Sequence, residues 1–289
     1  MTSVVIAAHN EETVIRACLD ALADQTALDG PLEVVVSANA CTDATVDIAR
    51  ACGVMVVDRP LLGKAASLNA GEAVAHGFPR IYLDADIVVP SNAIAELTAV
   101  LGGTAGVLAA VPRRIVNTKG RPWLVRAYFS INERLPAFAD GLFGRGVIAL
   151  SSEGRARFDV FPEMVADDLF LDSLFSAEEK ATVLAVEVVV EAPITSADLM
   201  RRLVRVRRGN SQMREAARSG EVEVSVRTSD RRAWLRVVVR EPRLLVSAVP
   251  YLAITLIAAR RARRSASSTD WGRDESTRAR PATSGEENG

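Results

Sequence analysis

The chain has 289 residues, of which 49% are hydrophobic and 25% are charged, and its net charge is −1 at pH 7. This is the composition of an ordinary globular protein, long enough for one large or two small domains with a sizeable core. Its three cysteines, Cys18, Cys41 and Cys52, follow no metal-ligand spacing, which excludes a recognisable cysteine metal site and favours a reducing compartment. No signal peptide precedes the apolar run that begins at residue 3, so we expect a cytoplasmic protein.

Short apolar runs alternate with segments of helical period in the first hundred residues. This alternation predicts repeated strand–helix units, and therefore a mainly parallel α/β sheet with helices on both faces. Strands are predicted over 3–8, 32–38, 54–57 and 80–86, and helices over 11–25, 42–53, 65–77 and 91–102, the last with Ser91 as its N-cap.

The middle of the chain is less regular. We predict a helix over 121–141 that is broken near Pro136, followed by a glycine-rich, strand-like stretch over 141–158. The predicted elements that follow are a short helix over 166–176, a strand over 182–193 and a long basic helix over 196–220. We expect a first domain over 1–228, made of two halves, 1–102 and 103–228.

Positive charge is concentrated toward the end of the chain. Residues 201–264 include 17 arginines, no lysine and five acidic residues, an excess of 12 positive charges. Such a block suggests a phosphate-rich partner, an anionic membrane surface or nucleic acid. Residues 265–289 show no periodicity and are expected to be disordered.

An apolar run, 244–259, lies inside the basic segment 229–264. It has 16 residues, fewer than the roughly 20 of a membrane-spanning helix, and it contains Pro250. Arginines flank it on both sides, and a single span would place one basic cluster on the far side of the membrane. We therefore expect 244–264 to lie in the membrane interface or to form a tight re-entrant hairpin; a buried core helix or a dimer contact is the alternative.

Two aspartates, Asp84 and Asp86, end the strand predicted over 80–86. Side chains two apart in a strand share a face, and ligands of open α/β sheets bind beyond the carboxyl ends of the strands. Two carboxylates there suit a hard divalent cation, Mg²⁺ or Mn²⁺, that keeps positions open for substrate phosphates. The alternative is a polar strand end with two solvated carboxylates.

The other predicted strands also end in polar residues. "HNEE" (9–12) follows the first strand, "SANACTD" (37–43) ends the second, and "GKAASLNAG" (63–71) follows the third. Some of these side chains could merely cap the helices that come next. Together with the aspartate pair, they predict a row of polar groups along one edge of the sheet.

In this order the motifs resemble a family 2 glycosyltransferase of the GT-A fold. The resemblance rests on V-V-I-x-A-H-N-E-E, N-x-C-T-D-x-T, G-K-x-x-x-L-N-x-G and D-A-D, and it continues through "GRGVIALS" (144–151), "ADD" (166–168) and "RRLVRVRRGN" (201–210). It implies a GT-A-type fold over 1–228, with the nucleotide bound by 1–102 and the acceptor by 103–228.

The resemblance implies a donor site for a nucleotide-diphospho-sugar. Asp86 would bind the metal, and Asp84 would lie beside the ribose or diphosphate and close to the metal. Asn39 stands where an aspartate more often binds the nucleobase of the donor, which leaves the preferred nucleobase open. The other nucleotide-binding residues that it implies on this side are Ala8, His9, Glu12 and Lys64.

On the acceptor side the resemblance implies that Asp168 is the catalytic base, with Asp167 as the second choice. From the residues alone, both could simply form an acidic first turn of a helix. Gly144 and Gly146 would let the backbone approach the sugar closely, or would form an ordinary turn. Arg205 and Arg208 would hold the diphosphate or solvate a surface.

The expected activity is inverting transfer of a sugar from a nucleotide-diphospho-sugar to a hydroxyl of a glycan or lipid-linked acceptor, with Mn²⁺ or Mg²⁺, as in cell-envelope glycan synthesis. The chain lacks Gln-x-x-Arg-Trp, so we expect one or a few sugars to be added. We expect contact with the inner face of the cell membrane and no nucleic acid partner.

Two alternatives remain open. A sugar-phosphate nucleotidyltransferase would usually open with a Gly- and Arg-rich phosphate loop, where this chain has "AAHNEE". A catalytically degenerate nucleotide-binding or interaction protein would not need the aspartates at 84, 86 and 168. A Rossmann dehydrogenase is excluded, because no G-x-G-x-x-G follows the first strand.

Overall fold

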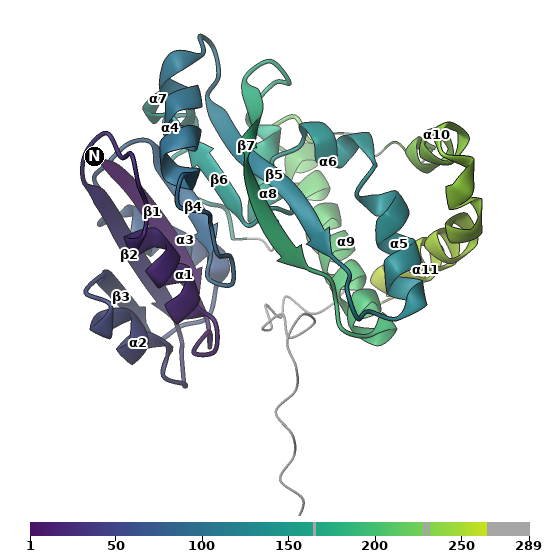
Figure 1. The fold of residues 1–289 in the computed structure, drawn as a ribbon, viewed down its shortest axis with the longest axis horizontal. Coiled ribbons are helices and arrows are strands. Elements are labelled where there is room, and N and C mark those ends of the chain that lie inside the picture. The colour runs from purple at the N-terminus through teal and green to yellow at the C-terminus, as the bar shows by residue number, and fades with distance from the viewer. Residues whose placement is uncertain (164–165, 228–229, 231, 265–289) are drawn as a thin grey trace, which may run out of the picture.

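A seven-stranded sheet organises the chain in the computed structural model, which describes residues 1–163, 166–227, 230 and 232–264 (Figure 1). The strands lie in the order β3-β2-β1-β4-β6-β5-β7. Their bounds are β1 Thr2–Ala8, β2 Leu32–Asn39, β3 Met55–Arg59, β4 Arg80–Asp84, β5 Ala109–Asn117, β6 Val147–Leu150 and β7 Lys180–Glu191.

Most neighbouring strands are parallel, as expected from the sequence. β1 pairs in parallel with β2 and β4, and the carboxyl ends of these strands align, because Ala8 pairs with Ala38 and Ala7 pairs with Asp84. β6 is the exception, since it runs antiparallel to both β4 and β5. The predicted halves 1–102 and 103–228 thus contribute to one sheet, the first with β1–β4 and the second with β5–β7.

Helices cover both faces of the sheet because β1 is apolar on both of its sides. Val4 and Ile6 pack against α1 and α4, whereas Val5 points to the opposite core, which includes residues of α3, α8 and α9. The bounds of these and the remaining helices of the sheet domain are α1 Ile15–Ala23, α2 Thr45–Ala51, α3 Lys64–Glu72, α4 Ala93–Gly103, α7 Ser152–Arg155, α8 Asp167–Ser173 and α9 Ser196–Ser219.

A third apolar cluster joins the last helices to the rest of the molecule. α5 (Trp123–Asn132), α9, α10 (Ala233–Arg240), a 3₁₀ turn η1 (Pro242–Leu244) and α11 (Leu245–Arg264) all contribute to it. Tyr128 of α5 stacks on Tyr251 of α11, with ring centroids 5.2 Å apart. α10 and α11 therefore lie beside α5, at the edge of the molecule farthest from β2 and β3 (Figure 1).

Several predicted elements need correction at their ends. β4 stops at Asp84, so Asp86 lies in the following turn and does not share a strand face with Asp84. The N-cap of α4 is Asn92 and not Ser91. Only 147–150 of the predicted strand-like stretch 141–158 is a strand. Before it, Gly144 and Gly146 adopt left-handed φ angles of 73° and 68°, and after it Ser152–Arg155 form α7. The predicted break near Pro136 is confirmed, since α5 ends at Asn132 and α6 (Pro136–Asp140) begins at that proline. The prediction for 265–289 lies outside the described residues.

Candidate active site

A pocket of about 370 Å³ opens at the carboxyl ends of β1 and β4. The loop before β6, the start of α8 and one face of α9 close its other sides. This is the position where parallel α/β sheets bind ligands. The predicted site residues that line it are His9, Lys64, Asp84, Asp86, Gly144, Gly146, Asp167, Asp168 and Arg205.

Lys64 at the start of α3 connects two acidic elements of the pocket. Its Nζ atom lies 3.0 Å from Oδ1 of Asp84 on β4 and 3.0 Å from Oδ2 of Asp167 on α8. Burial disfavours the charge of Lys64, but Asp167 and Asp84 outweigh this effect and hold its pKa above the usual range. The lysine is therefore a cation that ties the aspartate motif of β4 to the helix bearing the predicted base.

Asp84 and Asp86 differ in their surroundings. Asp84 is fixed by Lys64 and by its backbone N–H, which donates to the carbonyl of Gly146 at 2.8 Å. A Cβ on Gly146 would lie 2.5 Å from Ile87 Cγ1 and 3.1 Å from Asp84 Oδ2, so glycine is needed for this close approach. Asp86 is exposed and lines the pocket from the turn beyond the strand.

These two carboxylates fit a divalent ion that is held jointly with a substrate. Within the described ranges there is no group of three or more His, Cys, Asp or Glu side chains that could enclose a metal. Mg²⁺ is commonly bound by one or two carboxylates together with substrate phosphates, and this donor set matches that mode. Asp86 and Asp84 are the residues that would hold such an ion.

Asp168 also lines the pocket and is held there by backbone donors. Its Oδ2 accepts from the N–H of Gly144 at 3.2 Å, and its Oδ1 accepts from the N–H of Leu169 at 2.8 Å. Burial and repulsion by Asp167 raise the pKa of Asp168 to about 6, although Lys64 opposes the shift. A carboxyl group with this pKa is ionised at neutral pH and can accept a proton.

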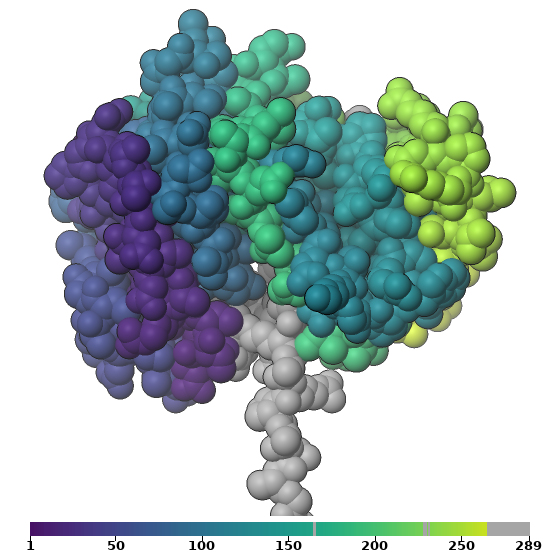
Figure 2. All heavy atoms as spheres, in the orientation of Figure 1, coloured from purple at the N-terminus to yellow at the C-terminus, as the bar shows by residue number. Residues whose placement is uncertain are grey.

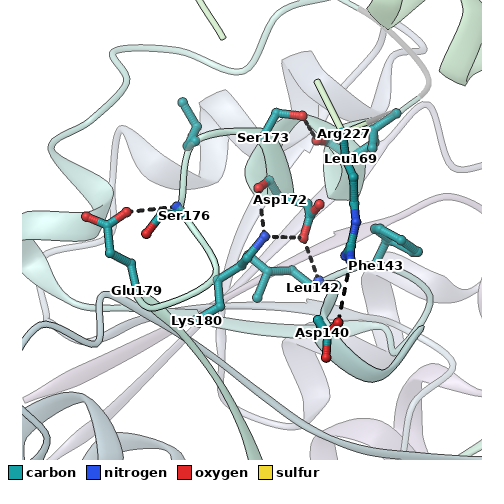
Figure 3. Close-up of polar contacts among 12 residues, drawn as sticks. Asp140, Leu142, Phe143, Leu169, Asp172, Ser173, Ser176, Glu179, Lys180 and Arg227 are labelled. Atoms are coloured by element: carbon teal, nitrogen blue, oxygen red, sulfur yellow. Dashed lines mark hydrogen bonds and ion pairs between the residues drawn. The ribbon is translucent and has the colours of Figure 1, made fainter. Parts of the chain in front are cut away.

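Two aspartates one turn apart attach α8 to the glycine loop, which we define as residues 141–146. Asp168 accepts from the N–H of Gly144. Asp172 accepts from the N–H of Leu142 at 2.9 Å (Figure 3). Asp172 is only 2% exposed, and its Oδ1 also lies 3.0 Å from Nζ of Lys180 on β7. This buried ion pair fixes the position of α8 relative to the sheet, and therefore the position of Asp168.

The residues at the ends of β1 and β2 that are predicted to bind the nucleoside do not all line the pocket, and some are buried in the interior. His9 lines the pocket, and its Nδ1 donates to the carbonyl of Asn39 at 2.6 Å. Asn39 is fully buried, and both polar atoms of its side chain have no hydrogen-bond partner within the described structure. Ala8 is also buried, and Glu12 accepts from the N–H of Ala44 at the start of α2. Their roles in binding the nucleoside stay predictions.

Glu11, Arg202 and Asn210 line the pocket but were not predicted from the sequence. Arg202 and Arg205 are three residues apart on α9 and face the pocket together, whereas Arg208 does not line it. Helical spacing could have paired Arg205 with Arg202 as readily as with Arg208. Only the packing of α9 against the sheet decides which pair faces inward.

Comparison with solved structures finds the same fold. The mannosyltransferase PcManGT from Pyrobaculum calidifontis, in complex with GDP-Man and Mn²⁺, aligns over 91% of this chain and 75% of its own, with 20% identity and a TM-score of 0.59. S. aureus TarS 1–349 in complex with UDP-GlcNAc aligns over 66% of this chain and 58% of its own, with 19% identity and a TM-score of 0.51. In its complex with UDP, TarS 1–349 shares 17% identity over 71% of this chain, with a TM-score of 0.50, and the chain spans 64% of its length.

Comparison with sequences identifies the family. Comparison with curated proteins gave no match. The profile of glycosyl transferase family 2 matches residues 3–154, which are more than half of the chain and carry the strand ends, Lys64 and the aspartate motif. This protein belongs to glycosyl transferase family 2 and has a GT-A-type fold.

Proposed function

We propose that this protein is an inverting, metal-dependent glycosyltransferase that moves a sugar from a nucleotide-diphospho-sugar to a hydroxyl group. One observation carries the proposal. Asp168, with a pKa of about 6, lines the same pocket as the Asp84–Lys64 pair and Asp86, at the ends of β1 and β4. A base and a diphosphate site within one pocket are what glycosyl transfer requires.

The donor would bind at the β1–β4 side of the pocket. Lys64 supplies a positive charge to the diphosphate, and Asp84 and Asp86 would hold the divalent ion. When bound, that ion would neutralise the charge that develops on the leaving diphosphate.

The transfer itself needs one base. Asp168 would take the proton of the acceptor hydroxyl as its oxygen forms a bond to the anomeric carbon. The bond from that carbon to the diphosphate breaks, and its electron pair leaves with the nucleoside diphosphate. Attack opposite the leaving group inverts the anomeric carbon through an oxocarbenium-like transition state. The acceptor would be a glycan or a lipid-linked molecule, which receives one or a few sugars.

We also propose that the enzyme works on the inner face of the cell membrane, bound through α10 and α11. Pro242–Arg264 could cross a membrane by length and composition alone, but Ala248, Tyr251 and Ile254 pack against the rest of the protein. Its opposite face is exposed and apolar, and no acidic residue occurs in 242–264. The apolar face is Leu235, Val239, Leu245, Val246, Val249, Leu256 and Ile257, and the arginines around it are Arg236, Arg240, Arg243, Arg260, Arg261, Arg263 and Arg264.

Binding of nucleoside diphosphates tests the donor site directly. We expect UDP or GDP to raise the melting temperature in the presence of Mn²⁺ or Mg²⁺ and to do so much less with a chelator. Asp86→Asn should raise the metal concentration needed by about ten-fold or more, because one charged ligand is lost. Asp58→Asn, at the end of β3 and outside the pocket, is the matched control and should behave as wild type. If no nucleoside diphosphate stabilises the protein with either metal, the proposed activity is wrong.

A further inference from the structure

Asn69 lies on α3 and binds the backbone of a distant segment with both ends of its side-chain amide. Its Nδ2 donates to the carbonyl of Phe161 at 3.0 Å, and its Oδ1 accepts from the N–H of Phe161 at 2.7 Å. The two residues are 92 positions apart in the sequence, and Asn69 does not line the pocket. The paired bonds join α3 to a segment that shortly precedes α8 in the sequence.

α3 is a fixed support for this contact. Ser67 is fully buried, and its Oγ donates to a carbonyl of β2 at 2.8 Å. A Cβ on Gly71 would lie 2.6 Å from Cγ1 of Val5 on β1, so the glycine lets the helix lie directly on the sheet. Ser67 and Gly71 come two residues before and two residues after Asn69. The position of Asn69 relative to the sheet is therefore fixed from both sides.

Phe161 extends the contact from α3 to the helix of the proposed base. Its side chain is 1% exposed, and its ring packs edge-to-face with those of Tyr82 and Phe170, at centroid distances of 5.0 Å and 6.1 Å. Tyr82 comes two residues before Asp84 on β4. Phe170 comes two residues after Asp168 on α8. Because edge-to-face ring contacts have a preferred geometry, Phe161 fixes α8 relative to β4.

A second residue of α3 holds the same segment. Glu72, one helical turn beyond Asn69, accepts from Nε of Arg155 at 2.8 Å. Arg155 also donates to the carbonyl of Phe158 and lies over its ring, 4.1 Å from the centroid. The ring of Phe158 packs edge-to-face with that of Phe170 at 5.3 Å. Both series of contacts from α3 therefore end on the same ring of α8.

We propose that Asn69 is a positioning residue that holds Asp168, the proposed base, in its place in the pocket. It acts through Phe161 and Phe170, and the inference rests on the proposed function. A base must lie within hydrogen-bond reach of the hydroxyl that it deprotonates, and a displacement of about 1 Å can cost about 10²-fold in rate. Lys64 begins the same helix as Asn69, so this connection keeps the donor side of the pocket and the base in register.

A double-mutant cycle on stability tests the inference without an acceptor. Burial raises the pKa of Asp168, so Asp168→Asn should raise the melting temperature of the full-length protein at pH 7.5. Asn69→Ala should let α8 relax toward solvent, and the gain from Asp168→Asn should then fall to about half or less. Circular dichroism measures the melts and shows that each variant is folded.

Gln25→Ala is the matched control. The amide of Gln25 also binds backbone at both ends, at the carbonyl of Pro90 and the N–H of Ile94, but beside α1 on the opposite face of the sheet. In this background the gain from Asp168→Asn should equal that in wild type. Arg155→Gln weakens the second connection and should reduce the gain as Asn69→Ala does, and it serves in the cycle if Asn69→Ala does not fold.

Two further measurements separate positioning from donor binding. Calorimetry should give the same affinity for a nucleoside diphosphate with Mn²⁺ in Asn69→Ala as in wild type, because the proposed donor residues are unchanged. Release of the nucleoside diphosphate from a nucleotide sugar, with water as the acceptor, follows turnover. We expect kcat to fall by about ten-fold or more in Asn69→Ala, and KM for the donor to stay the same.

Three results would overturn the inference and leave the proposed function standing. The first is an equal gain from Asp168→Asn in the wild-type, Asn69→Ala and Gln25→Ala backgrounds, since Asn69 would then only stabilise the fold. The second is no gain in wild type, and the third is loss of nucleoside diphosphate affinity in Asn69→Ala. Failure of wild type to bind any nucleoside diphosphate would instead reject the proposed function, whatever the cycle shows.

Discussion

At the residue scale, the pair Asp84 and Asp86 needs a cation, and the fold supplies one from the protein itself. Lys64 bridges Asp84 and Asp167 at 3.0 Å each, so part of the negative charge is neutralised before any substrate binds. The two aspartates are consequently unequal: one is tied to a lysine and the other reaches the open pocket from a turn. This division suits a metal site in which Asp84 would fix the position of the ion. Asp86, on the open side, would bind the ion as it enters from solvent and release it again.

The raised pKa of Asp168 predicts the pH dependence of the reaction. A base must be ionised, so kcat/KM should rise with pH through about 6 and level off above it. Asp168→Asn should lower kcat by about 10²–10⁴-fold, remove this limb of the profile and leave nucleoside diphosphate affinity unchanged. Steady-state kinetics between pH 5 and 8 and calorimetry check both parts. An Asp168→Asn variant with near-normal turnover would show that another group is the base.

The same pKa predicts a stability effect of opposite sign. Asp168 titrates near its ordinary value of 3.8 when unfolded and near 6 when folded, so the folded state binds more protons between these values. Its ionisation therefore destabilises the fold as pH rises through this window, by up to about 3 kcal/mol. Asp168→Asn should melt above wild type at pH 7.5, and the gap should close near pH 4. If the variant instead melts at a lower temperature than wild type at pH 7.5, the ionised Asp168 does not destabilise the fold.

At the scale of elements, the position of Asp168, the proposed base, depends on how α8 is fixed. Two aspartates on one side of this short helix bind the glycine loop, and Asp172 also reaches Lys180 on β7. The helix that carries Asp168, the proposed base, is thus fixed by a buried ion pair whose two residues do not line the pocket. Such support is needed because a seven-residue helix has little stability of its own.

Breaking this ion pair should be costly. Asp172→Ala leaves Lys180 charged and nearly buried and leaves the N–H of Leu142 unpaired, so we expect a loss of about 3–5 kcal/mol in unfolding free energy. Lys180→Met should cost a similar amount, and the Asp172→Leu/Lys180→Met double variant should recover part of the loss. Urea titration of the three variants measures these values. Arg113→Ala is the control, since its pair with Glu187 is exposed and should contribute at most about 1 kcal/mol. A loss below about 1 kcal/mol in Asp172→Ala would exclude the clamp.

The elements also show what could be predicted from the sequence. The strands β1, β2 and β4 and the long helix α9 follow from local periodicity, and their order places the polar strand ends at one edge. The bridge from Lys64 to Asp167 joins residues 103 positions apart in the sequence, and no local pattern encodes it. The choice of Arg202 over Arg208 depends in the same way on tertiary packing, as does the turn that carries Asp86 beyond the strand.

At the scale of the whole molecule, the candidate active site and the proposed membrane-binding face occupy different places. The pocket lies at the ends of β1 and β4. α10 and α11, in yellow-green in Figure 2, pack beside α5 at one edge of the molecule. α11 has one face in the protein core and one face in solvent, so a helix that crossed the bilayer would have to abandon the stacking of Tyr251 on Tyr128. Lying in the interface keeps that packing and covers the exposed face.

The exposed apolar face gives the last prediction. Val246 and Val249 are 70% and 73% exposed, and arginines lie around them, so the full-length protein should float with anionic vesicles and much less with neutral ones. Val246→Asp/Val249→Asp should weaken this binding by about ten-fold or more, because two apolar side chains that would insert into the lipid are lost and two negative charges face it instead. Leu184→Asp, at a 72% exposed position on β7, is the matched control and should float like wild type. If the double variant floats unchanged, or if the face instead forms a dimer in light scattering that the variant abolishes, the bilayer is not its partner.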